Sequence, residues 1–247
     1  MPHAHLRRSF AAVAALTAAF ALSVASQAAE PNPASRFDGI WNKAQGSLRY
    51  SQAPPFTPAA KAKFDNLRPQ DDPGARCTES GAPRVMISPY PLEIVARENH
   101  ILIVSEFNHV VRRIWTDQAK HDPDPDPSFY GDNVVHWEGD TMVVDTVGFN
   151  GRNYLDPAGD PMSPSLHMVE RWRLQDVDTL QIEFTFEDPK NYTKPWTSVQ
   201  TYLRKSDWKL GEFSCTDNNR NNPDNPNNPK NLTSTAAPEP YERPAKK

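Results

Sequence analysis

The chain has 247 residues, with 27 Lys and Arg against 31 Asp and Glu, and a formal net charge of −4. This acidic balance argues against nucleic acid and anionic lipid as partners, because both require a cationic face. The length suits a single domain with a substantial hydrophobic core.

The first 28 residues are typical of a secretory signal peptide. Arg7 and Arg8 precede an Ala-rich apolar run over 10–25, and Ser26-Gln27-Ala28 places small residues at a cleavage site. The run is shorter than the roughly 20 apolar residues of a spanning helix, so we expect no stable membrane insertion. Arg7-Arg8-Ser9-Phe10 also fits a twin-arginine signal, which leaves the export route open. We therefore expect a periplasmic or secreted protein whose mature part, without residues 1–28, has a net charge of −6.

A linker over 29–37 and one short helix are expected before the main domain. Thr57 as N-cap and Pro58 at the first helical position predict a helix that runs to Phe64. The polar stretch 68–74 contains proline and is expected to be a loop.

From Leu92 onward the pattern is that of β-strands joined by tight polar turns. The predicted strands are 92–97, 101–107, 110–116, 134–137, 142–147, 166–174, 180–186, 197–203 and 210–215. Glu138-Gly139-Asp140 is a strong hairpin signal. Sequential hairpins without intervening helices favour an antiparallel meander, and closure into a barrel removes exposed edges. We expect an all-β barrel over 38–216, with a β-sandwich as the alternative.

Cys77 and Cys215 are the only cysteines, and in an oxidising compartment they most simply form one disulfide. The bond would close a long loop and contribute about 4–5 kcal/mol. Beyond it, residues 217–247 are rich in Asn and Pro and are expected to be a disordered tail.

Several short segments resemble known families. Gly39-Ile40-Trp41 resembles the first strand of lipocalin-like barrels. The segment 137–146, Trp-Glu-Gly-Asp-Thr-Met-Val-Val-Asp-Thr, resembles a signature of a large family of exported bacterial proteins. The resemblance continues in Gly148-Phe149-Asn150, Glu170-Arg171, Asp188-Pro189, Tyr192-Thr193, Pro195-Trp196 and Glu212-Phe213-Ser214-Cys215. It implies export and a lipocalin-like barrel, and it transfers no activity.

Familiar catalytic motifs do not occur in the sequence. There is no Gly-x-Ser-x-Gly, phosphate loop, Gly-x-Gly-x-x-Gly, His-Glu-x-x-His or Cys-x-x-Cys. We therefore expect no nucleotide or other cofactor and no α/β-hydrolase. Acid–base chemistry stays open, because such sites in barrels rarely carry a compact linear motif.

Strand alternation makes Glu170 a candidate for chemistry. In the predicted strand 166–174 it shares a face with Met168 and Trp172, whereas His167 and Arg171 lie on the opposite face. If the apolar face points inward, Glu170 is a carboxylate in an apolar wall, where it would be neutral or need a cation. The alternative is a structural salt bridge to an arginine at position 112 or 113.

Two further carboxylates raise the same question. Asp145 shares a face with Val143 and Val147, and Glu106 follows a strand whose inner face is undecided. These acids either line a cavity or fasten the sheet together, and alternation alone does not say which face is interior.

The histidines divide by context. His121 opens His-Asp-Pro-Asp-Pro-Asp, but Asp-Pro units are stiff and extended, so we expect a solvated acidic loop and no metal site. His121 with Asp117 remains a candidate pair for proton transfer at a barrel rim. His136 lies beside Trp137 in a strand and can face either way. His167 and Glu170 fall on opposite strand faces, which argues against a metal pair.

Two functional hypotheses follow, both involving a small-molecule partner. The first is cofactor-independent acid–base chemistry of a lyase, isomerase or hydrolase. Its candidate base is Glu170 or Asp145, its proton donor His121 or His136, and its anion-stabilising group Arg113 or Arg171. The second is a non-catalytic, lipocalin-like binder of a hydrophobic molecule. Candidate ligand contacts in either case are Trp137, Trp172, Tyr130, Trp196 and Glu106. A third possibility is an envelope-associated scaffold whose tail contacts a partner.

Overall fold

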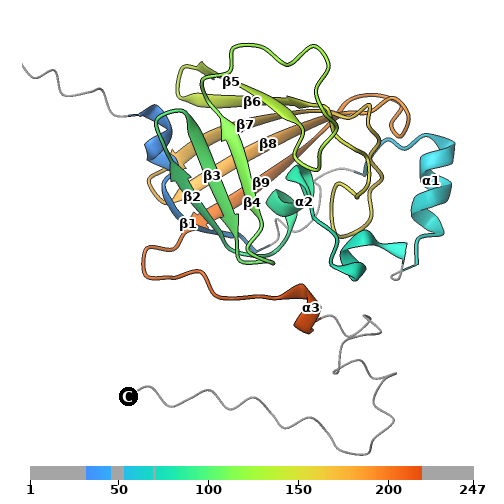
Figure 1. Cartoon of the computed structure of the whole chain (residues 1–247), viewed down its shortest axis with the longest axis horizontal. Helices are drawn as coiled ribbons and strands as arrows, with labels where there is room; N and C mark the ends of the chain where they lie inside the picture. The colour runs from blue at the N-terminus through green and yellow to red at the C-terminus, as the bar shows by residue number, and fades with distance from the viewer. Residues whose placement is uncertain (1–31, 46–52, 69–70, 219–247) are drawn as a thin grey trace, which may run out of the picture. The chain divides into compact units, whose positions relative to one another are not determined.

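The computed structural model describes residues 32–45, 53–68 and 71–218. Its elements are η1 (Pro33–Phe37), β1 (Gly39–Lys43), α1 (Pro58–Asp65), η3 (Pro73–Arg76), α2 (Ala82–Ile87), β2 (Leu92–Ala96), β3 (His100–Ser105), β4 (Val111–Trp115), β5 (Asp132–Glu138), β6 (Thr141–Val147), β7 (His167–Asp176), β8 (Thr179–Glu187), β9 (Trp196–Arg204) and α3 (Cys215–Asn218) (Figure 1). The expected signal peptide over 1–28 lies outside these residues, as does the expected tail over 217–247 except for Asp217 and Asn218, which belong to α3. Within them, no helix is long and apolar enough to cross a membrane.

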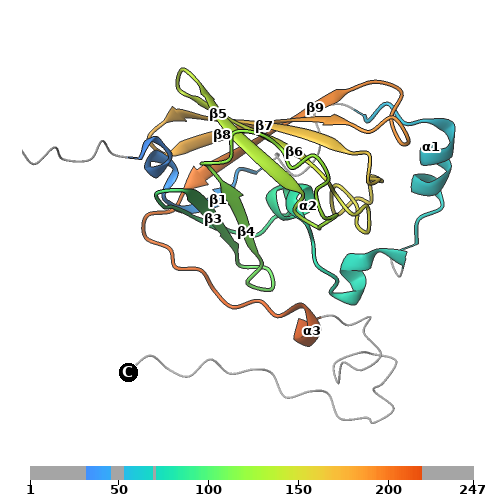
Figure 2. The same cartoon turned by 45° about the horizontal axis from the view of Figure 1, so that its top comes forward.

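The strands form one antiparallel sheet that curls into a nearly closed barrel (Figures 1 and 2). Their order is β4-β3-β2-β1-β9-β8-β7-β6-β5, so β1 joins the two halves through its pairings with β2 and β9. At the seam between β4 and β5, the Asn133 side chain donates a hydrogen bond to the Trp115 carbonyl at 3.0 Å. The predicted barrel is confirmed, and the β-sandwich alternative is set aside.

One predicted strand is wrong. Residues 210–215 form no strand; Phe213 makes a single parallel bridge to Phe107, and the segment runs into α3. The strand that precedes it in the chain, β9, already pairs with β8 on one side and β1 on the other. It therefore has no free edge for another strand.

The short N-terminal helix is confirmed as α1. The Thr57 hydroxyl accepts a hydrogen bond from the Ala60 amide at 3.2 Å, and Pro58 occupies the first turn. This is the N-cap arrangement that satisfies an otherwise unpaired amide.

The helix α2 was not predicted, and all six of its side chains are buried. Its last carbonyls are capped from the sheet: the Tyr202 hydroxyl donates to the Met86 carbonyl, and the Lys43 ammonium donates to the Ile87 carbonyl. A cation at a helix C-terminus is favoured by the exposed carbonyls there. Two strands, β1 and β9, thus hold α2 in place.

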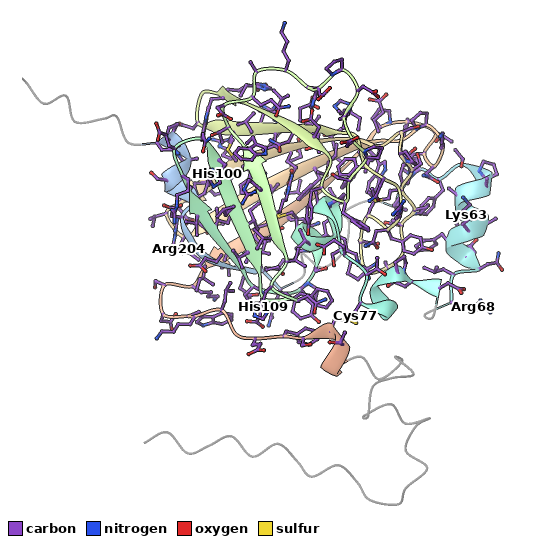
Figure 3. The ribbon with its side chains drawn as sticks, in the orientation of Figure 1. Lys63, Arg68, Cys77, His100, His109 and Arg204 are labelled. Atoms are coloured by element: carbon purple, nitrogen blue, oxygen red, sulfur yellow. A yellow bond between two sulfur atoms is a disulfide. The ribbon has the colours of Figure 1, made fainter. Side chains whose placement is uncertain are left out.

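The expected linker ends in η1, which belongs to the barrel. Phe37 is fully buried, and its carbonyl accepts a hydrogen bond from Trp41 Nε1 at 2.8 Å. Arg204 of β9 is labelled in Figure 3. Its guanidinium lies 4.2 Å from the centre of the Trp41 ring and donates to the Asp38 carbonyl. This cation–π contact joins β9 to the segment that begins the barrel.

The core consists of the inward-facing apolar residues of the strands, as alternation predicts, together with buried residues of η1, α2 and the loop after β6. Its largest fully buried apolar side chains include Trp41, Trp172, Tyr202, Phe37, Phe149, Phe184, Phe186, Met86, Ile87, Leu92 and Ile94. The predicted disulfide is confirmed: Cys77 and Cys215 are bonded across 138 residues of chain.

Candidate functional site

Glu170 lies inside the barrel and is paired with Arg112. The Glu170 side chain is 0% exposed and the Arg112 side chain 1%. Arg112 Nη1 donates to Glu170 Oε1 at 2.9 Å, and Arg112 Nη2 donates to Glu170 Oε2. The geometry is that of a bidentate arginine–carboxylate pair. It corresponds to the salt-bridge alternative considered from the sequence.

The pair connects opposite walls of the barrel, because Arg112 is on the edge strand β4 and Glu170 is on β7. Burial, followed by the charge of Glu170, raises the pKa of the Tyr202 hydroxyl beyond its ordinary range, so this group stays protonated. Both ends of the ion pair are satisfied and closed off from solvent. In this position Glu170 fastens β4 to β7.

The interior also contains polar atoms without hydrogen-bond partners among the described residues. They are Trp172 Nε1, Gln200 Oε1 and Thr146 Oγ1. Gln200 Nε2 is engaged with Ser198 Oγ at 2.8 Å, so only its oxygen is left over. Trp172 and Gln200 lie in one cross-strand row, each opposite Ile182 of β8. Buried polar atoms of this kind are uncommon and call for an explanation.

Asp145 lies on the outer face of the barrel, in a group that we call the outer cluster: His121, Asp132, Asp145 and His167. Asp145 Oδ1 is 3.1 Å from His121 Nε2 and 2.8 Å from His167 Nε2. His121 Nδ1 is 2.8 Å from Asp132 Oδ2. The four side chains come from β5, β6, β7 and the loop before β5, and their exposed fractions range from 19% to 38%.

Asp132 anchors the loop that carries His121. It accepts hydrogen bonds from Gln118 Nε2 at 2.7 Å and from the Asp122 amide at 3.1 Å. Burial raises the pKa of Asp132, but the hydrogen bonds from Gln118, His121 and the Asp122 amide outweigh it, so the pKa lies below its usual value. Asp132 is therefore an ionised carboxylate that orients the imidazole.

The hydrogen bonds constrain the protons of the two imidazoles. A neutral imidazole has one N–H, and His121 faces a carboxylate oxygen at each ring nitrogen. When both carboxyl groups are ionised, the two contacts are hydrogen bonds only if His121 carries both protons. His167 Nε2 lies 2.8 Å from Asp145 Oδ1, and an ionised Asp145 requires the proton of His167 to be on Nε2; the Nδ1 atom of His167 is 3.8 Å from a carboxylate oxygen of Glu187.

A surface groove of about 240 Å³ adjoins the outer cluster at the barrel seam. Asp132 lines it together with Arg113 and Trp115 of β4. The Arg113 guanidinium lies 5.4 Å from the centre of the Trp115 ring. The groove therefore presents a cation, an aromatic face and carboxylates next to the imidazoles.

His136 and Arg171 form a separate exposed network. His136 Nε2 is 3.2 Å from Glu138 Oε1, and Arg171 Nη2 donates to Glu138 Oε2 at 2.5 Å. The hydrogen bond from Arg171, followed by that from His136, lowers the pKa of Glu138 to about 2. This arrangement is an ordinary surface ion network.

The remaining predicted residues lie apart from the outer cluster. Glu106 accepts a hydrogen bond from the Gly211 amide at 2.9 Å, and the Tyr130 hydroxyl donates to Glu79. Trp137 stacks on Phe37, whereas Trp196 packs against Phe186 and Tyr192. Of the residues predicted for chemistry, the structure brings together His121 and Asp145.

Sequence reasoning missed Asp132 and His167. Alternation correctly placed His167 opposite Glu170, but its meeting with Asp145 depends on the β6–β7 register, in which Asp145 pairs with Val169. Among the described residues, no group of three or more His, Cys, Asp or Glu side chains is arranged to hold a metal ion.

No family model and no curated protein matches the sequence. Solved structures with similar folds include a Schistosoma mansoni fatty acid binding protein in complex with arachidonic acid, at 15% identity and a TM-score of 0.36, covering 71% of this chain and 100% of that one. A secretory abundant heat soluble protein from Ramazzottius varieornatus has 8% identity and a TM-score of 0.35, covering 69% and 96%. The fluorescent protein UnaG has 13% identity and a TM-score of 0.34, covering 69% and 98%. These similarities assign no function to this chain.

Proposed function

We propose that the outer cluster performs cofactor-independent acid–base chemistry on a small molecule held in the adjoining groove. The observation that carries this proposal is the convergence of two imidazole Nε2 atoms, 3.1 and 2.8 Å away, on one oxygen of Asp145. A carboxylate shared by two imidazoles can take a proton from one partner and pass it to another.

Each member has a distinct role in the proposed step. Asp145 takes a proton from the substrate, and His121, oriented by Asp132, returns one. His167 is the most exposed member and exchanges protons with solvent. Arg113, at the groove, stabilises negative charge that develops on the substrate.

Stability alone gives a poor account of the cluster. Ion pairs between partly exposed groups contribute little to folding, typically about 0–1 kcal/mol. The buried pair of Arg112 and Glu170 already connects the walls of the barrel. Four titratable side chains gathered beside a groove instead match the usual composition of an acid–base site.

The test combines a reaction screen with three variants. The purified protein is incubated with p-nitrophenyl esters, to detect hydrolysis, and with small ketones in D2O, to detect proton abstraction by NMR. We expect turnover that falls at least about 100-fold in Asp145→Asn and in His121→Gln. His109→Asn is the matched control, because His109 lies in the exposed β3–β4 turn with a left-handed φ of 50° that asparagine tolerates (Figure 3).

A second readout does not need a substrate. Nitrogen-15 spectra of the histidine rings report which nitrogen carries the proton. We expect His167 to hold its proton on Nε2 in the native protein and to lose this preference in Asp145→Asn. The proposal fails if His167 shows no tautomer preference, or if turnover survives both the Asp145 and His121 changes.

A second candidate function is the binding of a hydrophobic molecule inside the barrel. It is favoured by the unpartnered Trp172 Nε1 and Gln200 Oε1, which offer one donor and one acceptor in an apolar interior. A ligand with a polar group would satisfy both atoms and bury its apolar part against the core.

Native mass spectrometry of protein purified without detergent tests this candidate. The expected result is a co-purified small molecule that is lost from Gln200→Leu and kept by Gln181→Leu, a change on the outer side of the neighbouring strand β8. Absence of any bound molecule, with both variants folded, argues against it. Turnover in the reaction screen would separate the two functions.

We also propose that the protein acts in the periplasm or outside the cell. The Cys77–Cys215 disulfide supports an oxidising compartment. Cell fractionation of the full chain, with an Arg7→Lys/Arg8→Lys variant to separate the export routes, tests this. Full retention of wild-type protein in the cytoplasm would contradict it.

A further inference from the structure

A second cavity, of about 420 Å³, lies at the end of the barrel where α1 meets the β8–β9 loop. Figures 1 and 2 show these two segments side by side, and a bridge between Phe56 and Tyr192 joins them. The cavity falls within the range of about 300–1,000 Å³ that small-molecule sites occupy. We call it the end cavity.

Three cationic side chains border the end cavity, and no acidic residue lines it. Lys63 comes from α1 (Figure 3). Arg152 comes from the segment after β6, and Lys190 from the β8–β9 loop. In the described part of the chain, none of the three has a carboxylate within salt-bridge distance, although the whole chain has a net charge of −4. By contrast Lys61, two residues before Lys63, pairs with Asp65 at 2.6 Å.

The acids near the cavity are already engaged. Asp72 pairs with Arg84 at 2.7 Å, and Asp71 pairs with Arg68 at 2.7 Å. Asp160, beside the cavity wall at Pro161, is buried; this burial, together with the charge of Asp156, raises the pKa of Asp160 to about 8. It is therefore mostly uncharged at neutral pH, and none of the three cations forms an ion pair with a described residue.

Hydrogen bonds fix the walls of the cavity. Asp188 is 1% exposed and accepts from the Ser163 amide and hydroxyl, both at 2.7 Å, and from Asn191 Nδ2 at 2.7 Å. The Lys190 amide also donates to Asp188, at 3.2 Å. The Arg152 amide donates to Asn150 Oδ1 at 3.0 Å. The backbone that carries two of the three cations is thus held in place before any ligand arrives.

Tyr154 adds a hydrogen-bond donor to the same cavity. Burial, followed by the charges of Asp72 and Asp71, raises the pKa of its hydroxyl, so the group keeps its proton. Cations and a hydroxyl donor together are the groups that bind phosphate or carboxylate oxygens.

We propose that the end cavity binds a small molecule with two or more anionic groups, held by Lys63, Arg152 and Lys190. The site is separate from the outer cluster, and its occupation does not depend on acid–base chemistry there. Phosphoryl and carboxylate groups share the required chemistry, and the experiment distinguishes them.

Isothermal titration calorimetry of the full chain with inorganic pyrophosphate and, separately, with citrate tests the proposal. We expect saturable binding of at least one probe, weakened by added NaCl because the contacts are ionic. The charge-neutral variant Lys63→Gln/Arg152→Gln/Lys190→Gln is expected to bind at least about tenfold more weakly. Lys205→Gln is the control, because Lys205 lies after β9, away from the end cavity, with its ammonium 5.4 Å from the centre of the Trp208 ring.

The outcomes are distinct. Binding of pyrophosphate alone assigns a phosphorylated ligand, and binding of citrate alone assigns a polycarboxylate; both support the site. Failure of both probes to bind at millimolar concentration overturns the proposal. Equal affinity in the triple variant and in Lys205→Gln also overturns it, because binding would then reflect general charge. Circular dichroism of each variant verifies that the barrel is intact.

Discussion

At the scale of single residues, the buried partnership of Arg112 and Glu170 has a direct energetic consequence. Glu170→Gln leaves the Arg112 charge inside the barrel without its counter-charge. We expect this change to reduce the free energy of unfolding by about 3–5 kcal/mol. Urea denaturation followed by tryptophan fluorescence measures it.

The double variant Arg112→Met/Glu170→Leu separates the ion pair from its surroundings. Replacing both charges by apolar groups of similar size removes the desolvation penalty together with the attraction. We expect the double variant to be more stable than either single variant. If a single variant lowers the free energy of unfolding by less than about 1 kcal/mol, water must reach the ion pair.

At the scale of residues, the sequence predicted which side chains share a strand face, but it did not predict which residues they contact on other strands. Alternation correctly set Glu170 among apolar side chains and named Arg112 as one possible partner. It left open whether Asp145 lines a cavity or fastens the sheet, and the structure places Asp145 on the outer face with two imidazoles. Which face is interior depends on how the sheet curls, and that depends on pairings distant in sequence.

At the scale of elements, α2 is held by Lys43, whose charged form is disfavoured by burial. Burial lowers the pKa of Lys43 to about 7, although the charge of Asp156 acts in the opposite direction. Between pH 7 and about 10.5 the unfolded chain binds more protons at this lysine than the folded chain does. The titration of Lys43 therefore makes the free energy of unfolding rise with pH through this window.

Replacement of Lys43 tests this linkage. In Lys43→Met the rise is lost, and we expect the stability difference between wild type and variant to change by at least about 1 kcal/mol between pH 7 and 9.5. Urea denaturation at half-unit pH intervals measures it, and Lys209→Met serves as the exposed control. Parallel curves for wild type and Lys43→Met would contradict the burial of a titrating amine.

Elements differed in how well the sequence predicted them. Hairpins with strong turn residues were predicted to within a few residues, because Gly139, with φ of 60°, marks the β5–β6 turn unambiguously. The helix α2 was not predicted, because Ala82–Ile87 is short and all its side chains are buried. Its sequence therefore shows no amphipathic period. The segment 210–215 had an apolar pattern, but the strand that precedes it, β9, is already paired on both sides.

At the scale of the whole molecule, the disulfide joins the chain before β2 to the chain after β9. The loop that it closes is long, so its removal releases much conformational freedom in the unfolded chain. We expect Cys77→Ser/Cys215→Ser to lose about 4–5 kcal/mol while keeping the barrel. Thermal unfolding with and without reductant measures this, since only the wild type should respond to reductant.

A different result would change the explanation of how the disulfide stabilises the protein. Equal midpoints for oxidised and reduced wild-type protein would mean that the two ends stay together in the unfolded state without the bond. Loss of the barrel signal in the double serine variant would mean instead that closure is needed for folding.

The covalent loop also determines how the molecule would respond to being pulled. Once β1 has been pulled away from β2 and β9, force applied to the two chain ends passes through the sulfur–sulfur bond, so the eight strands from β2 to β9 carry no load. With the bond intact, full extension falls short by the reach of the chain between Cys77 and Cys215, a sequence separation of 138, or roughly 450–500 Å. An optical trap would register that missing length until reductant is added, when the barrel becomes the element that resists.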